Sequence, residues 1–144
     1  MRRLRSGQRG VAMLETLVAV LVFSVGVLGY LRLLEMSLRN ADSAAFRQQA
    51  ALLAEAMVDR LRADRDAALE GDYDLALAAS PAGQGEAAAA LAAWRADLAG
   101  TLPAGGGGVD CDGAAFCTVT VVWDDRRATA GREQQFFTLR ARIR

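Results

Sequence analysis

Glu15 is the first residue in this sequence whose type and place could do chemistry. It lies in an apolar stretch, is followed by the uncharged run Thr16–Leu31, and comes shortly after Gly10, which ends a basic segment. A carboxylate in the middle of a bilayer costs about 2.5–3.5 kcal/mol, so Glu15 needs either a place at the membrane surface or a charged partner. Cleavage after Gly10 would supply that partner, because the new α-amine of Val11 would lie four residues from Glu15, on the same helix face. In a helical stack, the amine of one subunit could equally reach the Glu15 of the next.

The two cysteines, Cys111 and Cys117, are the second pair of interest, and the sequence contains no histidine. The lack of histidine excludes a His-based triad, a His metal site and a His proton switch. A zinc site would need further ligands, whereas two nearby thiols in an oxidising compartment favour a local disulfide. We therefore expect a Cys111–Cys117 disulfide, and we expect no catalytic residues, no metal and no cofactor.

Charge is balanced over the 144 residues, with 17 basic and 17 acidic side chains, but it is unevenly distributed. Four arginines precede the first acid, so removal of residues 1–10 would leave a mildly acidic chain. An acidic balance argues against general affinity for nucleic acid. The length suits one small domain and one membrane-grade segment.

The apolar segment Val11–Leu31 is long enough to cross about 30 Å of hydrocarbon if Glu15 is tolerated. The alternative is the apolar region of a secretory signal, but no good Ala-x-Ala cleavage site follows it. Arginines before the span predict a cytoplasmic N-terminus and a translocated remainder.

Helical periodicity continues beyond the apolar segment. The residues of one amphipathic stripe recur every three or four positions: Phe46, Ala50, Leu53, Met57 and Leu61. With no proline before Pro81, the pattern predicts one helix from about Val11 to Asp66 or Leu69.

The C-terminal half reads as a mixture of helix and strand. Residues 72–85 read as a loop, Glu86–Leu98 as a second helix and Gly105–Gly108 as a flexible connector. Alternation predicts that Phe116–Trp123 and Gln134–Ile143 form a β-hairpin. The order of elements predicts an α+β fold.

Three other features have a functional and a structural interpretation. Trp94 and Trp123 could be ligand platforms, but packing between the second helix and the sheet is favoured. The glycine run is no phosphate loop, because no Lys and Ser/Thr follow it. A basic C-terminal strip could bind DNA, but the lack of interleaved aromatic residues favours a solvated face of an edge strand. This strip comprises Arg126, Arg127, Arg132, Arg140, Arg142 and Arg144.

The N-terminal motif resembles that of the type IV pilin superfamily: a short basic leader ending in glycine, an apolar stretch and a glutamate at its fifth position. Here it reads Arg9-Gly10-Val11-Ala12-Met13-Leu14-Glu15-Thr16-Leu17-Val18-Ala19, with Val11 where the family usually has Phe. The resemblance implies a long N-terminal helix packed on a small antiparallel sheet with a short second helix. It also implies four regions: a leader (1–10), a transmembrane and assembly half of the helix (11–31), an amphipathic periplasmic half (32–70) and a globular periplasmic head (71–144).

Within the superfamily the chain is most similar to the PilV subgroup of minor pilins, the type IV pilus modification proteins. The similarity lies in Leu17–Gly29, Ala54–Arg65, Trp94, Leu102-Pro103 and Val119–Asp125.

The resemblance implies that the chain is the substrate of an enzyme and not itself an enzyme. A prepilin peptidase and N-methyltransferase would cut between Gly10 and Val11 and methylate the amine of Val11, and Glu15 would form the assembly salt bridge. The subunit would wait in the inner membrane as a single-pass protein with a periplasmic head. It would then join other minor and major pilins in the pilus and support assembly, twitching motility and adhesion. A minor pseudopilin of a type II secretion system and a signal-anchored periplasmic binding module are the alternatives.

Overall fold

The computed structural model describes residues 8–112, 114–128 and 131–143, and the side chains of these residues from Val11 onward. Residues 1–7, most of the expected leader, and Arg144 of the basic strip lie outside the described residues. The chain forms two compact units, Met1–Leu38 and Arg39–Arg144.

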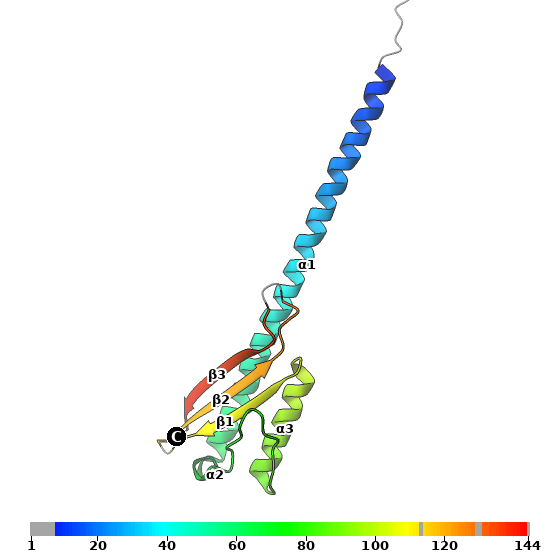
Figure 1. The fold of residues 1–144 in the computed structure, drawn as a ribbon. Helices are drawn as coiled ribbons and strands as arrows, with labels where there is room; N and C mark the ends of the chain where they lie inside the picture. The colour runs from blue at the N-terminus through cyan, green and yellow to red at the C-terminus, as the bar shows by residue number, and fades with distance from the viewer. Residues whose placement is uncertain (1–7, 113, 129–130, 144) are drawn as a thin grey trace, which may run out of the picture. The chain divides into compact units, whose positions relative to one another are not determined.

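Helix α1 spans Gln8–Ala63 and is the longest element (Figure 1). The predicted single helix to Asp66 or Leu69 is wrong in one respect, because the helix is interrupted at Asp64 and resumes as α2 (Arg65–Glu70). Asp64 has φ −120° and ψ 56°, and its carboxylate accepts a hydrogen bond from the hydroxyl of Tyr73 at 3.0 Å. Aspartate is a weak helix former because its side chain can bond outside the helix, and here it does so. Helix α2 then ends at Gly71, whose φ of 90° suits glycine.

The sheet in the second unit has three antiparallel strands in the order β1-β2-β3. They span Gly106–Cys111, Phe116–Trp123 and Gln135–Arg142. The hairpin predicted from sequence is confirmed: Phe116 pairs with Arg142 at one end, and Trp123 pairs with Gln135 at the other. The observed architecture is therefore α+β, with a long N-terminal apolar helix and a small antiparallel sheet.

Strand β1 corrects the prediction of a flexible connector at Gly105–Gly108. Gly106, Gly107 and Gly108 are buried strand residues that pair with β2. A Cβ on Gly107 would lie 2.4 Å from Cη2 of Trp94. A Cβ on Gly108 would lie 2.8 Å from the carbonyl oxygen of Leu75. These glycines therefore permit close approach of neighbouring elements, a role that apolar periodicity cannot reveal.

Helix α3 spans Glu86–Thr101, three residues beyond the predicted end at Leu98. Its apolar stripe, Leu91, Trp94 and Leu98, is buried. The indole of Trp94 donates a hydrogen bond to the carbonyl oxygen of Leu53 on α1 at 3.0 Å. This hydrogen bond connects α3 to α1.

The core of the second unit lies between the C-terminal part of α1, α3 and the inner face of the sheet (Figure 1). The predicted stripe on α1 is confirmed, because Ala50, Met57 and Leu61 are buried and Phe46 and Leu53 pack against them. Trp123 and Trp94 are also buried, as their predicted packing role requires.

Candidate functional site: the exposed apolar segment of α1

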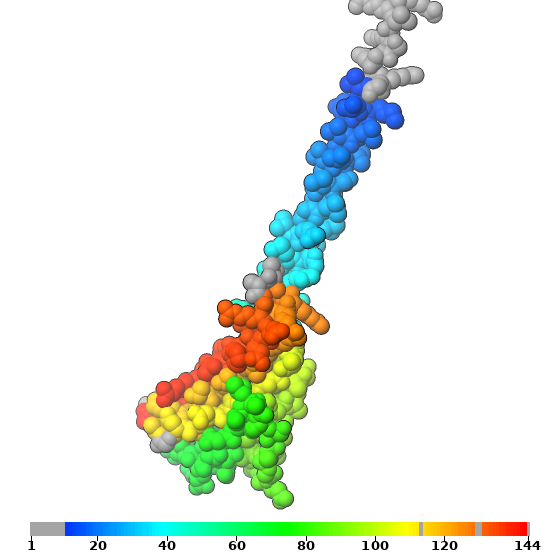
Figure 2. All heavy atoms as spheres, viewed as in Figure 1, coloured from blue at the N-terminus to red at the C-terminus, as the bar shows by residue number. Residues whose placement is uncertain are grey.

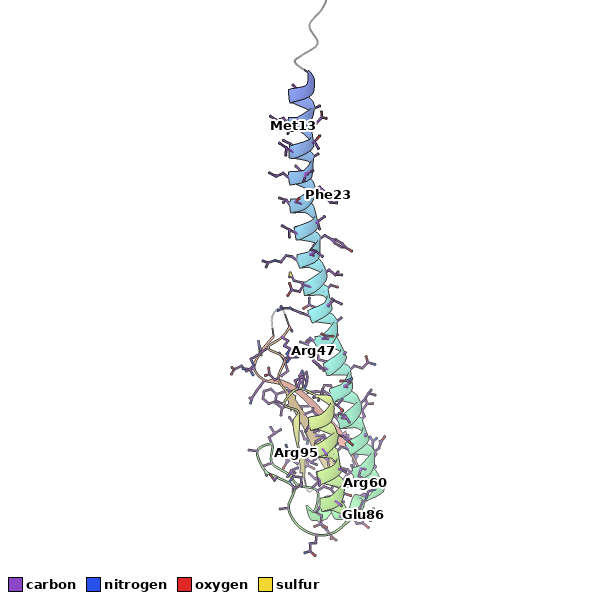
Figure 3. All side chains as sticks on the ribbon, turned by 90° about the vertical axis from the view of Figure 1, so that its right-hand side faces the viewer. Met13, Phe23, Arg47, Arg60, Glu86 and Arg95 are labelled. Atoms are coloured by element: carbon purple, nitrogen blue, oxygen red, sulfur yellow. A yellow bond between two sulfur atoms is a disulfide. The ribbon has the colours of Figure 1, made fainter. Side chains whose placement is uncertain are left out.

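The apolar segment of α1, residues 11–38, exposes large apolar side chains on every side. Their exposed fractions run from 39% at Val27 to 72% at Phe23. Figure 3 shows Met13 and Phe23 projecting away from the helix into open space. Soluble proteins rarely expose a continuous apolar surface of this length, because each apolar Å² left in water forgoes about 25 cal/mol. The surface of the segment is therefore suited to apolar surroundings and not to water.

The polar side chains of this segment are compatible with an apolar environment. Thr16 Oγ1 donates to the carbonyl oxygen of Ala12 at 2.9 Å, and Ser24 Oγ donates to that of Val20 at 2.7 Å. Both hydroxyl protons thus find acceptors on the helix itself, as residues in hydrocarbon require. Among the described residues, α1 is the one helix long and apolar enough to cross a membrane.

Val11 and Glu15 lie one helical turn apart in α1, and both are exposed. In a helix, residues four apart are neighbours on one face, so an amine at Val11 could reach the carboxylate of Glu15. Cleavage after Gly10, methylation of Val11 and the salt bridge to Glu15 stay predictions, because the structure holds the uncleaved chain.

A cluster of polar side chains connects the end of α1 to neighbouring elements of the second unit. Arg60 forms an ion pair with Glu86 at the start of α3, and Figure 3 labels the two residues at the same end of the second unit. Arg60 Nε also donates to the hydroxyl of Tyr73 at 3.3 Å, which in turn donates to Asp64. Burial is the main cause that raises the pKa of Tyr73. The cluster therefore links the end of α1 to α3 and to the loop that follows α2.

Arg95 performs a similar function on the other side of α3. Its Nη2 donates to the carbonyl oxygens of Leu77 at 2.9 Å and Ala79 at 2.5 Å, and so holds the loop before α3. Burial lowers the pKa of Arg95. Sequence analysis missed this residue, since nothing in its neighbourhood marks an arginine that binds carbonyl oxygens.

The predicted disulfide between Cys111 and Cys117 is present and closes the β1–β2 turn. Asp112 lies inside this turn, and its carboxylate accepts hydrogen bonds from the backbone N–H of Phe116 at 2.9 Å and of Ala114 at 3.0 Å. It also pairs with Arg140 of β3 at 2.9 Å. The bond from Phe116, followed by that from Arg140, lowers the pKa of Asp112. The disulfide and the ion pair between Asp112 and Arg140 therefore both stabilise the turn.

The arginines of the basic strip differ in the contacts that they form. Arg140 pairs with Asp112, and Arg126 pairs with Asp124 at 2.6 Å. The guanidinium groups of Arg140 and Arg142 lie 4.8 and 5.7 Å from the centre of the Phe116 ring. Arg142 is exposed on β3, the edge strand, as predicted for a solvated face.

A buried contact joins α1 to the β2–β3 loop. Ser43 Oγ donates to Oδ2 of Asp125 at 2.7 Å, and only 3% of Asp125 is exposed. The pair borders a hollow of about 380 Å³ whose other lining residues include Asn40 and Arg47. Within the described ranges, no group of three or more Asp, Glu, Cys or His side chains is placed to hold a metal ion.

Comparisons with protein families, curated proteins and solved structures found no match to this chain.

Proposed function

We propose that this chain is a minor pilin subunit of a type IV pilus. Its leader is removed between Gly10 and Val11, the new amine of Val11 is methylated, and the subunit waits in the inner membrane with its head in the periplasm. It then joins other minor and major pilins in the fibre, where it primes, tips or modifies assembly. Motility and adhesion follow from the assembled pilus.

The observation that carries this proposal is the carboxylate of Glu15, placed one turn from Val11 near the start of the exposed apolar segment of α1. A simple membrane anchor gains nothing from a charge at that position, since the charge opposes insertion. An assembly helix gains a specific partner, because the amine of one subunit can neutralise the carboxylate of its own chain or of a neighbour.

The exposed side chains of the apolar segment support the same proposal. An assembly helix must exchange lipid for neighbouring helices, so its surface has to satisfy both surroundings. Gly26 and Gly29 have open space where a Cβ would stand, which allows the backbone of another helix to approach closely there.

The experiment that tests the proposal is mass spectrometry of the N-terminus in protein extracted from the inner membrane of a piliated host. We expect the natural chain to begin at Val11 with a methylated amine, and Gly10→Val to keep residues 1–10. The matched control is Gly29→Val, which adds the same side chain in the same helix outside the junction and should be cleaved normally. A natural chain that keeps its first ten residues would contradict the proposal.

A further inference from the structure

Strand β3 is an open edge of the sheet, whereas the opposite edge is covered. On β1, the N–H of Val109 donates to the carbonyl oxygen of Leu75 at 2.9 Å, and the N–H of Leu75 donates to the carbonyl oxygen of Val109 at 2.8 Å. Strand β3 has one neighbouring strand, β2, and eight residues in extended conformation. Figure 1 shows β3 at the outer side of the sheet, and Figure 2 shows its residues at the molecular surface.

The register identifies which backbone groups of β3 point outward. The N–H of Ile143 donates to Ala115 across the β2–β3 pair at 2.9 Å. Hydrogen-bonded pairs recur at every second residue of an antiparallel ladder, so Ala141, Leu139 and Phe137 also turn their N–H and C=O groups toward β2. The even-numbered residues between them, Thr138 among them, therefore direct their N–H and C=O groups toward the open edge.

The core is also incompletely covered beside β3. The inward residues of β2, Val119 and Val121, are fully buried, whereas their partners on β3, Leu139 and Phe137, are only half-buried. Beyond β3 lies a hollow of about 330 Å³ between the strand and α1. It is lined by Glu55, Val58, Asp59, Arg62, Leu139 and Ala141.

Charge distinguishes the two sides of this edge. Arg142 lies on the outer face of β3, and Glu55 lies beside the hollow on the inner side. Neither forms an ion pair with any residue that the structure describes. A strand laid along β3 would alternate its side chains between these two sides.

We propose that the open edge of β3 binds an extended segment of another protein, which adds a fourth strand to the sheet. Its outward side chains are acidic and face Arg142, and its inward side chains are apolar and cover Leu139 and Ala141 above the hollow. The backbone supplies most of the affinity, and the side-chain alternation supplies the specificity. This inference stands independently of the proposed function, since it concerns the second unit alone.

A second copy of this chain is the less favourable occupant. Antiparallel pairing of two β3 strands in one sheet relates the copies by a two-fold axis along the sheet normal. Strand β3 contains no acidic residue, so a second β3 strand would place no carboxylate opposite Arg142.

The test uses the isotope-labelled full chain in detergent micelles and a peptide of four Glu-Val repeats as the probe. We expect saturable shifts and increased exchange protection at the amides of Phe136, Thr138, Arg140 and Arg142. A matched pair of proline variants gives the decisive comparison. Thr138→Pro removes an edge-facing N–H, which edge strands tolerate, so the head should stay folded and the peptide should bind at least tenfold more weakly. Leu139→Pro removes a ladder N–H and should unfold β3 itself.

Charge reversal gives a second, independent measurement. Arg142→Glu should weaken binding of the Glu-Val peptide about two- to fivefold and strengthen binding of a Lys-Val peptide by a similar factor, as expected for an exposed pair. Self-association of the chain through β3, detected as a dimer without peptide, would overturn the choice of occupant. Equal binding by Thr138→Pro and the natural chain, or no saturable binding up to millimolar peptide, would overturn the proposal itself.

Discussion

At the scale of single residues, the second unit depends on a few polar side chains that bind backbone or buried partners. Asp125 is the most sensitive of them, because the residue is only 3% exposed and its carboxyl group accepts a hydrogen bond from the hydroxyl of Ser43. Arg95 and Asp112 each hold a loop through backbone groups. Such contacts contribute little net stability when complete, but removing one partner leaves the other buried and unsatisfied.

Ser43→Ala should therefore lower the free energy of unfolding by about 1–3 kcal/mol, because the buried carboxyl group of Asp125 loses its hydroxyl donor. The matched control is Ser24→Ala, the same change on the same helix at a hydroxyl that is bonded only to its own helix backbone. Urea unfolding followed by tryptophan fluorescence measures both, because Trp94 and Trp123 are buried. Equal effects of the two changes would show that the contact to Asp125 contributes nothing.

Asp112 should make stability depend on pH. Hydrogen bonds from Phe116 and then Arg140 lower its pKa below the ordinary 3.8, so the folded state favours the charged form. This stabilisation is fully present above the unfolded pKa and is lost as pH falls through the folded pKa. We expect Asp112→Asn to be less stable than the natural chain above pH 4 and to approach it at lower pH. Unfolding curves measured at several pH values check this, and a difference that grows as pH falls would contradict it.

At the scale of elements, the sequence predicted those structures whose pattern lies in apolar side chains. The amphipathic stripe of α1, the second helix and the β2–β3 hairpin all have such a pattern, and the structure confirms them. Strand β1 was missed because Gly106–Gly108 has no side chains that could alternate. The break at Asp64 was missed because its cause, a hydrogen bond from Tyr73, is a tertiary contact.

Two glycines of the α3–β1 region should respond in opposite directions to the same substitution. Gly107→Ala places a Cβ 2.4 Å from Trp94, so it should cost about 1–3 kcal/mol of stability through overpacking. Gly100 lies in α3 with open space around its Cα, so Gly100→Ala should stabilise by up to about 1 kcal/mol through helix propensity. Thermal unfolding of both variants tests this. A tolerated alanine at Gly107 would mean that β1 and α3 do not pack as described.

At the scale of the whole molecule, the chain combines an apolar helical segment with a small α+β head. The sequence predicted the disulfide between Cys111 and Cys117, because two nearby thiols are evident from residue type and spacing, and the structure confirms it. The role of Glu15 stays a prediction. The sequence could not locate the contact between Ser43 and Asp125, which are 82 residues apart, or the open edge of β3. Pairings of this kind depend on the fold and have no local signature. The function proposed above rests on Glu15, so the central test is made there.

The most direct test of the account is incorporation of Glu15→Ala into sheared pili. The change removes a charge from an apolar helix, so membrane insertion and removal of residues 1–10 should remain intact. An amine of Val11 buried without its carboxylate would cost about 3–5 kcal/mol, so incorporation should fall more than a hundredfold. Thr16→Val, its neighbour, loses only a hydroxyl bonded within the helix and should assemble normally. We predict processed Glu15→Ala protein in the membrane and none in the sheared fraction; equal amounts of Glu15→Ala and natural subunit in that fraction would contradict the account.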